Sequence, residues 1–246
     1  MVACASGGLS RVRLTNQYGA PEQFLRAVQN DEYSRGDASF SATGLIRPPQ
    51  MARLEEEHAD KISADVADHV YMLLGTGVHA IMEKAAPDGS LVEKRWYAEM
   101  LGYKISGAID LYHDGHITDY KVTGTYSVKS PKVEWEQQLN IYAWLLRQND
   151  MPVRSLTIVA ICRDHMKSKV GTKNYPDSPI VPIDIPVWLP NVAEDFVRSR
   201  VELHTSQDVV PCTDEERWAR GNRYVRCESY CSVSDFCSQH NREGIK

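Results

Sequence analysis

The sequence has no long apolar run, no internal repeat and no low-complexity tract. No stretch approaches the roughly 18 to 20 apolar residues that span a bilayer. The beginning, MVACASGGLSRVR, lacks the basic and apolar regions of a secretion signal. We therefore expect a cytoplasmic protein without a membrane partner. A share of charged residues of 25% and of hydrophobic residues of 42% also excludes collagen-like, disordered and coiled-coil chains.

The chain also lacks an excess of positive charge. It has 28 Lys and Arg residues against 33 Asp and Glu residues, a formal net charge of −5. This balance argues against a protein whose whole surface coats nucleic acid, but it permits a local basic groove. At 246 residues the chain is long enough to bury a large apolar core without disulfide support.

The hydrophobic pattern predicts alternating helices and strands along most of the chain. Residues 1–40 are polar, and we expect this N-terminal segment to be partly disordered, above all in Met1 to Ser10. Gly75 and Gly77 interrupt the first long helical pattern, which indicates close packing or a bend. The order predicts an α/β protein with a central mixed sheet flanked by helices. The helices expected are 54–83, 135–147 and 190–204, and the strands expected are 92–99, 104–112, 116–123, 155–163 and 180–189.

Two acidic residues on neighbouring predicted strands flank a tight turn at residues 113–115. Asp110 precedes the turn, Asp119 follows it, and Lys121 lies two residues further on the same face of its strand. Two carboxylates about 4 Å apart repel by about 4 kcal/mol at an effective dielectric of about 20, and a hard cation such as Mg²⁺ or Mn²⁺ removes that repulsion. The pattern predicts metal-assisted phosphodiester hydrolysis. The alternative is that the acids cap a hairpin and the lysine is an ordinary surface residue.

Four motifs in a fixed order give this pattern a specific context. They are GVHAIME with His79, GAIDL with Asp110, ITDYKVT with Asp119 and Lys121, and QLNIY with Gln138 and Tyr142. In this order the sequence resembles the PD-(D/E)xK nuclease superfamily, and within it the RecB-like branch that includes CRISPR spacer-acquisition nucleases and many phage exonucleases.

The resemblance implies a restriction-endonuclease-like nuclease core over residues 41–206. It also implies roles for single residues. The catalytic metal would be held by His79, Asp110, Asp119 and the backbone carbonyl of Tyr120. Lys121 would position the attacking water, and Gln138 and Tyr142 would touch the lysine or the DNA backbone. Glu93 or Glu99, on the preceding strand, could supply a carboxylate for a second metal.

Cysteine is scarce except near the end of the chain, where a segment over residues 207–246 is cysteine-rich. Cys227, Cys231 and Cys237 have a spacing that suits either Zn²⁺ or an iron–sulfur cluster. The resemblance favours a [4Fe–4S] cluster, with Zn²⁺ as the alternative. The fourth ligand would be Cys212 in preference to Cys4. Cys162 lies in an apolar strand, where we expect it to act as a small hydrophobic residue.

Two basic segments are candidates for contact with nucleic acid. The first carries Arg163, Lys167, Lys169 and Lys173, and the second includes Arg223 among interleaved aromatic residues. The resemblance implies an exonuclease on single-stranded DNA or duplex ends, in recombination, repair or phage DNA processing, with possible recombination or replication partner proteins. The alternatives are a non-catalytic nucleic-acid-binding accessory protein and a structural zinc protein whose acids are incidental.

Overall fold

The computed structural model describes residues 13–30 and 35–242, and its contacts divide the chain into two compact units. The first unit takes residues 1–34, 44–69 and 199–246, and the second takes residues 35–43 and 70–198. Met1 to Ser10, for which disorder is predicted, and Cys4 lie outside the described residues. The ranges 41–206 and 207–246 expected for a nuclease core and a terminal segment stay predictions.

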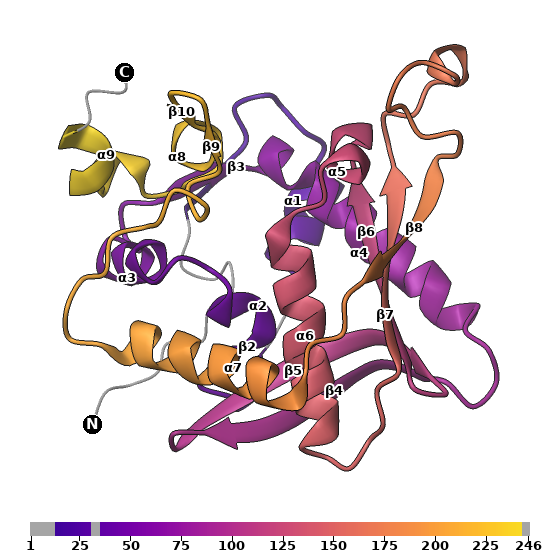
Figure 1. Ribbon diagram of the computed structural model, residues 1–246. Helices are drawn as coiled ribbons and strands as arrows, with labels where there is room; N and C mark the ends of the chain where they lie inside the picture. The colour runs from indigo at the N-terminus through magenta and orange to yellow at the C-terminus, as the bar shows by residue number, and fades with distance from the viewer. Residues whose placement is uncertain (1–12, 31–34, 243–246) are drawn as a thin grey trace. The chain divides into compact units, whose positions relative to one another are not determined.

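A six-stranded mixed sheet forms the centre of the second unit (Figure 1). Strand β4 pairs antiparallel with β5, β5 antiparallel with β6, β6 parallel with β7, and β7 antiparallel with β8. The short β2 adds to β5 in parallel. This arrangement confirms the predicted α/β class with a mixed sheet. The strands are β2 (Phe40–Ser41), β4 (Leu91–Met100), β5 (Tyr103–His113), β6 (His116–Thr123), β7 (Ser155–Cys162) and β8 (Ile180–Ile185).

Two tight turns set the register of the three antiparallel strands β4, β5 and β6. Leu101 and Gly102 connect β4 to β5 with φ values of 53° and 79°, and Asp114 and Gly115 connect β5 to β6 with 43° and 81°. Positive φ at both central residues is the geometry of two-residue hairpin turns whose twist matches that of the strands. The turn predicted near residues 113–115 is therefore present, and each hairpin has one fixed pairing.

The helices of the second unit pack mainly through α6. It contacts β4, β5, β6 and β7, and its buried residues include Leu139, Ile141 and Leu145. Gly107 on β5 permits this approach, because a Cβ there would lie 2.7 Å from the ring of Tyr142. The helices are α4 (Val70–Lys84), α5 (Thr125–Lys129), α6 (Val133–Arg147), the 3₁₀ helix η3 (Lys167–Lys169) and α7 (Pro190–Thr205), whose residues from Ser199 onward belong to the first unit.

The first unit consists of short elements. Its parallel strands β1 (Arg13–Thr15) and β3 (Ser63–Asp65) pair, and α1 (Glu22–Gln29) contacts the 3₁₀ helix η2 (Val66–His69). The remaining elements are α2 (Ala42–Leu45), which begins in the second unit, α3 (Pro49–Glu57), β9 (Ala219–Arg220), β10 (Arg223–Tyr224), α8 (Val225–Ser229), η4 (Ser234–Phe236) and α9 (Ser238–Arg242).

The long helix predicted over residues 54–83 is wrong. The chain leaves helix α3 at Glu57, forms β3, and begins α4 only at Val70. The reason is a non-local pairing: residues 63–65 form a parallel ladder with residues 13–15, which local periodicity cannot reveal. The close packing or bend expected at Gly75 and Gly77 is also absent, because α4 is continuous and a Cβ at either glycine would meet no atom within 4 Å.

In the described part of the chain, no helix is long and apolar enough to cross a membrane.

Candidate functional site

Three acidic residues lie at the same level on three neighbouring strands of the sheet. Val92 pairs with Leu111 and Lys94 with Ile109, so the register places Glu93 of β4 across from Asp110 of β5. Leu111 pairs with Thr118, so Asp119 of β6 is the next residue on the other side of Asp110. Because both hairpin turns have two residues, the three acidic residues lie across from one another on neighbouring strands, although Asp119 is not part of the close group that the other two form with His79.

His79 of α4 reaches this point from the helix that packs over β6. Its Nδ1 lies 3.2 Å from Glu93 Oε1, and its Nε2 lies 3.1 Å from the carbonyl oxygen of Tyr120 and 3.6 Å from Asp110 Oδ2. Over residues 13–30 and 35–242, His79, Glu93 and Asp110 make up the only group of three or more potential ligand atoms within 4.8 Å of one another. An imidazole, two carboxylates and a carbonyl oxygen thus share one small site.

Asp110 is the most constrained carboxylate of the group. It is 8% exposed, and its Oδ2 accepts a hydrogen bond of 2.8 Å from the backbone N–H of Tyr120, just beyond the last paired residues of β5 and β6. Burial, and then repulsion from Asp119, raises the pKa of Asp110 to about 7, although His79 and Lys121 act against the shift. Burial and the nearby Asp119 therefore make the ionised form of Asp110 unfavourable in the metal-free protein.

His79 holds a proton at neutral pH. Its hydrogen bond to Glu93 is the largest cause that raises its pKa to about 9, with further support from Asp110 and the carbonyl of Tyr120, against the opposing effect of burial. The imidazolium therefore donates one N–H to Glu93 and the other to the carbonyl of Tyr120. A divalent cation would have to replace this proton to use the imidazole as a ligand.

A second set of contacts surrounds Asp119. The ammonium of Lys121 lies 2.6 Å from Asp119 Oδ2, and Gln138 Nε2 donates to Asp119 Oδ1 at 3.3 Å and to the hydroxyl of Tyr142 at 2.7 Å. Burial opposes the charge of Lys121, but Asp119 and Asp110 outweigh it and raise the pKa of the lysine. Gln138 and Tyr142 are both buried, and Gln138 links the hydroxyl of Tyr142 to Asp119; the contact of these two residues with the lysine or the DNA backbone stays a prediction.

Of the two glutamates that the sequence offered for a metal site, Glu93 and Glu99, the structure places Glu93 beside His79 and Asp110. Glu93 has a positive φ of 47° and is exposed beside His79, whereas Glu99 pairs across from Lys104, about 20 Å further along the strand. A two-residue turn at Leu101 and Gly102, had it been predicted from the sequence, would have favoured Glu93 over Glu99. That turn places residue 93 across from Asp110 on the next strand. The unusual backbone of Glu93 has no signal in the sequence.

The donor set fits a divalent cation that prefers oxygen. Carboxylate and carbonyl oxygens suit Mg²⁺ and Mn²⁺, and a single imidazole is acceptable to Mn²⁺ in particular. The raised pKa of Asp110 is a second indication of a cation site, separate from the types of the donor atoms. A cation beside Asp110 and Asp119 would remove the repulsion between the two carboxylates.

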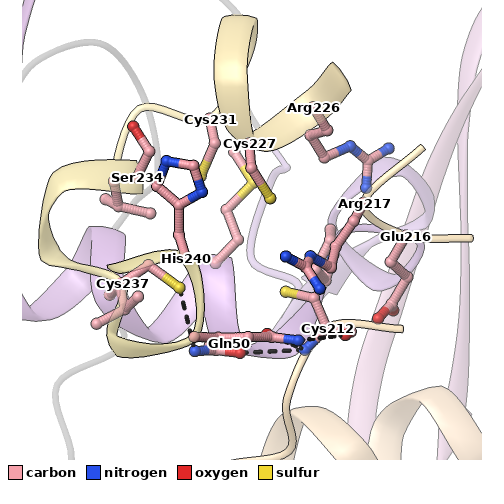
Figure 2. Close-up of a pocket in the computed structure, with 15 residues that line it drawn as sticks. Gln50, Cys212, Glu216, Arg217, Arg226, Cys227, Cys231, Ser234, Cys237 and His240 are labelled. Atoms are coloured by element: carbon pink, nitrogen blue, oxygen red, sulfur yellow. Dashed lines mark hydrogen bonds between the residues drawn. The ribbon is translucent and has the colours of Figure 1, made fainter. Parts of the chain in front are cut away.

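The four C-terminal cysteines line one pocket in the first unit (Figure 2). The backbone N–H of Cys212 donates to Gln50 Oε1 at 3.1 Å, and Gln50 Nε2 lies 3.4 Å from Cys237 Sγ. Gln50 thereby ties Cys212 to the terminal segment. The cysteines are Cys212, Cys227, Cys231 and Cys237.

Two thiols of this pocket, those of Cys212 and Cys231, resist ionisation. Burial first, and then Glu216 and the other three thiols, raises the pKa of Cys212 to about 12, and burial also raises the pKa of Cys231. Thiolates here need nearby positive charge. Cys162, in contrast, is buried in β7 of the other unit, a position that suits a small hydrophobic residue. Burial raises the pKa of its thiol.

The basic residues expected to meet nucleic acid have different environments. Lys167, Lys169 and Lys173 are exposed in the segment between β7 and β8. Arg223 is also exposed but donates to Glu228 at 2.8 Å, so its charge has a partner within the chain. Arg217, from the same segment, is 3% exposed and stacks on Tyr224.

A histidine and two acidic residues, with a lysine beside a third acid on the same mixed sheet, are the kind of groups that metal-dependent phosphodiesterases use. The sequence matches the model of the PD-(D/E)XK nuclease superfamily over residues 12–238, and the chain belongs to this superfamily. The resemblance to this superfamily, stated from the four motifs, is thus confirmed.

Comparison with solved structures supports the fold. The crystal structure of SSO0001 is similar with a TM-score of 0.54 and 19% sequence identity, covering 88% of this chain and 93% of that one. At this identity the similarity concerns the fold alone. No curated protein matches the sequence.

Proposed function

We propose that the chain is a metal-dependent deoxyribonuclease that acts as an exonuclease. Membership of the superfamily indicates a nuclease. The observation that carries the metal-dependent step is the convergence of His79, Glu93 and Asp110 within 4.8 Å, with Lys121 held by the neighbouring Asp119.

Each residue has a distinct task in this proposal. His79, Asp110, Asp119 and the carbonyl of Tyr120 hold a Mg²⁺ or Mn²⁺ ion, together with Glu93. The ion supplies Lewis acidity toward the scissile phosphate and lowers the pKa of a bound water. Lys121 is 24% exposed in its side chain, so its ammonium can reach a water or a phosphate oxygen while Asp119 keeps it in place. Gln138 and Tyr142 position Asp119.

DNA as the substrate, attack from an end and a place in recombination, repair or phage DNA processing rest on the resemblance to RecB-like nucleases. The exposed Lys167, Lys169 and Lys173 support an anionic polymer as substrate, since each can contact a phosphate. Arg223 stays a weaker candidate because a phosphate would compete with Glu228. The rival, a non-catalytic accessory protein, would not need a lysine paired with a buried carboxylate.

The test is cleavage of end-labelled single-stranded and duplex DNA, with Mg²⁺ or Mn²⁺ and with chelator. We expect products only with the metal, and a loss of at least about 100-fold in Asp110→Ala and in Lys121→Met. Asp114→Asn, a change in the exposed turn, is the matched control and should cleave as the wild type does. DNA binding without any product in Mn²⁺ would favour the accessory protein, and a circular substrate that is cut would exclude a strict exonuclease.

We also propose that Cys212, Cys227, Cys231 and Cys237 bind a [4Fe–4S] cluster. Tetrahedral Zn²⁺ with Zn–S bonds of about 2.3 Å brings its sulfurs to about 3.8 Å from one another. In the described residues no three cysteine sulfurs lie within 4.8 Å of one another, although all four line one pocket. A cluster separates its thiolates further, because each one binds a different iron; the preference for a cluster over zinc rests on the resemblance to RecB-like nucleases.

Anaerobic purification followed by iron, sulfide and zinc analysis tests this assignment. We expect four irons and four sulfides per chain and absorbance near 400 nm, as is general for such clusters. Cys212→Ser should lose the cluster, whereas Cys4→Ser and Cys162→Ser should keep it. Stoichiometric zinc without iron would make the site structural zinc, and loss in Cys4→Ser with retention in Cys212→Ser would reverse the choice of the fourth ligand.

A further inference from the structure

An exposed aromatic residue and an arginine form a stacked pair in the same unit as the metal site. The guanidinium of Arg163 lies 4.0 Å from the ring centroid of Tyr71, which is on the first turn of α4. Tyr71 is 54% exposed, and Arg163 is exposed as well. Burial therefore does not explain why the tyrosine is here, and neither residue has a part in the metal site.

Strand β6 and helix α4 each connect this pair to the metal site. The backbone N–H of Arg163 donates to the carbonyl of Thr123 at 2.9 Å, and Thr123 is two residues beyond Lys121 on β6. On α4, Tyr71 precedes His79 by eight residues, which is about 12 Å along the helix. This length corresponds to about three or four nucleotides of a stacked strand at about 3.4 Å each.

The position of Arg163 is fixed by its neighbour. Asp164 accepts from the backbone N–H of Thr125 at 2.7 Å, and its carboxylate also lies beside Gly124. The end of β7 is thus attached to the end of β6, so Arg163 has a defined place beside the metal site. Because the carboxylate of Asp164 accepts the N–H of Thr125, the guanidinium of Arg163 lies over Tyr71 and not against its acidic neighbour.

Positive charge continues from Arg163 along one loop. Lys167, Lys169 and Lys173 follow it between β7 and β8, with Asp164 as the only acidic residue over residues 163–173. For these four basic residues, the described residues provide no ion pair with a carboxylate. The exposed ring of Tyr71 thus has one cation, Arg163, stacked on it, and further exposed cations follow Arg163 along the chain; aromatic rings combined with cations are how proteins bind single strands without sequence preference.

We propose that Tyr71 and Arg163 bind single-stranded DNA, with a base stacked on the tyrosine and a phosphate on the arginine, about three nucleotides from the metal site. This inference deepens the proposed nuclease function and rests on it for its biological meaning. A base can stack on Tyr71 only if it is unpaired, so the pair selects single strands, or the frayed ends of duplexes, over intact duplex.

Binding of a short fluorescein-labelled single strand and of the matching blunt duplex, by fluorescence anisotropy in chelator, tests the proposal without cleavage. Tyr71→Ala should weaken single-strand binding by about 5- to 150-fold, the range for loss of one stacked base, and leave its salt dependence unchanged. Tyr71→Phe keeps the ring and should bind as the wild type. Ile81→Ala, on the same helix and 61% exposed, is the control and should have no effect.

Arg163→Ala should weaken binding and reduce the slope of log Kd against log salt by about 0.7, the value for one phosphate of a single strand. Arg163→Lys should keep the slope. Wild-type affinity in Tyr71→Ala, or an equal loss for single strand and duplex, would overturn the proposal, as would a wild-type protein that cleaves DNA but does not bind single strands.

Failure of the proposed nuclease function has a different signature. Cleavage in Mn²⁺ would be absent while single-strand binding still depended on Tyr71.

Discussion

Replacement of Asp110 by asparagine should stabilise the metal-free protein while it abolishes cleavage. Asparagine has nearly the same shape, and its carbonyl oxygen can still accept the N–H of Tyr120 that Asp110 Oδ2 accepts at 2.8 Å. The substitution removes the negative charge of Asp110, a residue that is only 8% exposed and is repelled by Asp119. The change therefore isolates the electrostatic cost of keeping a metal ligand ionised before the metal binds.

The size of the effect follows from the pKa of Asp110, which burial and Asp119 raise from 3.8 to about 7. A difference of about 3 units corresponds to an upper value of about 4 kcal/mol, at about 1.36 kcal/mol per unit. Because the folded state has the higher pKa, it binds more protons than the unfolded state between about pH 4 and 7. The wild type should accordingly lose stability as pH rises through this window, with no further change from Asp110 above about pH 7.

Urea unfolding in chelator, followed at several pH values, measures this difference. At pH 8 we expect Asp110→Asn to be more stable than the wild type by about 1 to 4 kcal/mol, with the gain disappearing toward pH 4. Asp114→Asn, an exposed change in the adjacent turn, should show no such gain. Added Mn²⁺ should stabilise the wild type and not Asp110→Asn. A variant less stable than the wild type at pH 8, or a difference that does not change with pH, would refute the reasoning.

Three further outcomes are expected. The apparent affinity for Mn²⁺, measured by calorimetry, should fall about tenfold per pH unit below about 9, where the ion displaces the proton of His79, and more steeply below about 7, where Asp110 also binds a proton; an affinity independent of pH would contradict this. Gln138→Leu should lower kcat or the affinity for Mn²⁺ by about 10- to 100-fold, because the metal ligand Asp119 loses a buried hydrogen bond that orients it; unchanged kcat and unchanged Mn²⁺ affinity would remove its positioning role. Gly107→Ala should destabilise the fold by about 1 to 3 kcal/mol in urea unfolding because its Cβ would meet Tyr142, whereas Gly77→Ala in the open interior of α4 should stabilise it by up to about 1 kcal/mol; similar effects of the two changes would be inconsistent with this packing.

Most strands of the central sheet could be predicted from the sequence because their signals are local. The strand expected at 116–123 has the bounds of β6, and those expected at 92–99 and 104–112 each fall within one residue of the ends of β4 and β5. Turn residues and alternating apolar residues suffice for such hairpins. The failure over residues 54–83 has the opposite cause, since β3 exists only through its pairing with β1, about 50 residues away.

Within the candidate site, the motifs identified residues by type but gave no contacts. Spacing alone could not show that Gln138 holds Asp119, that His79 lies between Glu93 and the carbonyl of Tyr120, or that Arg163 stacks on Tyr71. These contacts depend on how α4 and α6 pack against the sheet, which is a property of the whole unit.

The two hairpin turns have a consequence for how this protein can vary. Hairpin tips usually tolerate insertions, because they are exposed and far from functional groups. Here one residue added between Leu101 and Gly102 would shift the register of β4 by one residue and so turn Glu93 to the opposite face of the sheet. The insertion would act over about 27 Å, the length of strand between Glu93 and the turn. An insertion at either tip should therefore abolish metal binding in a protein that still folds, and length changes compatible with activity should be confined to other loops.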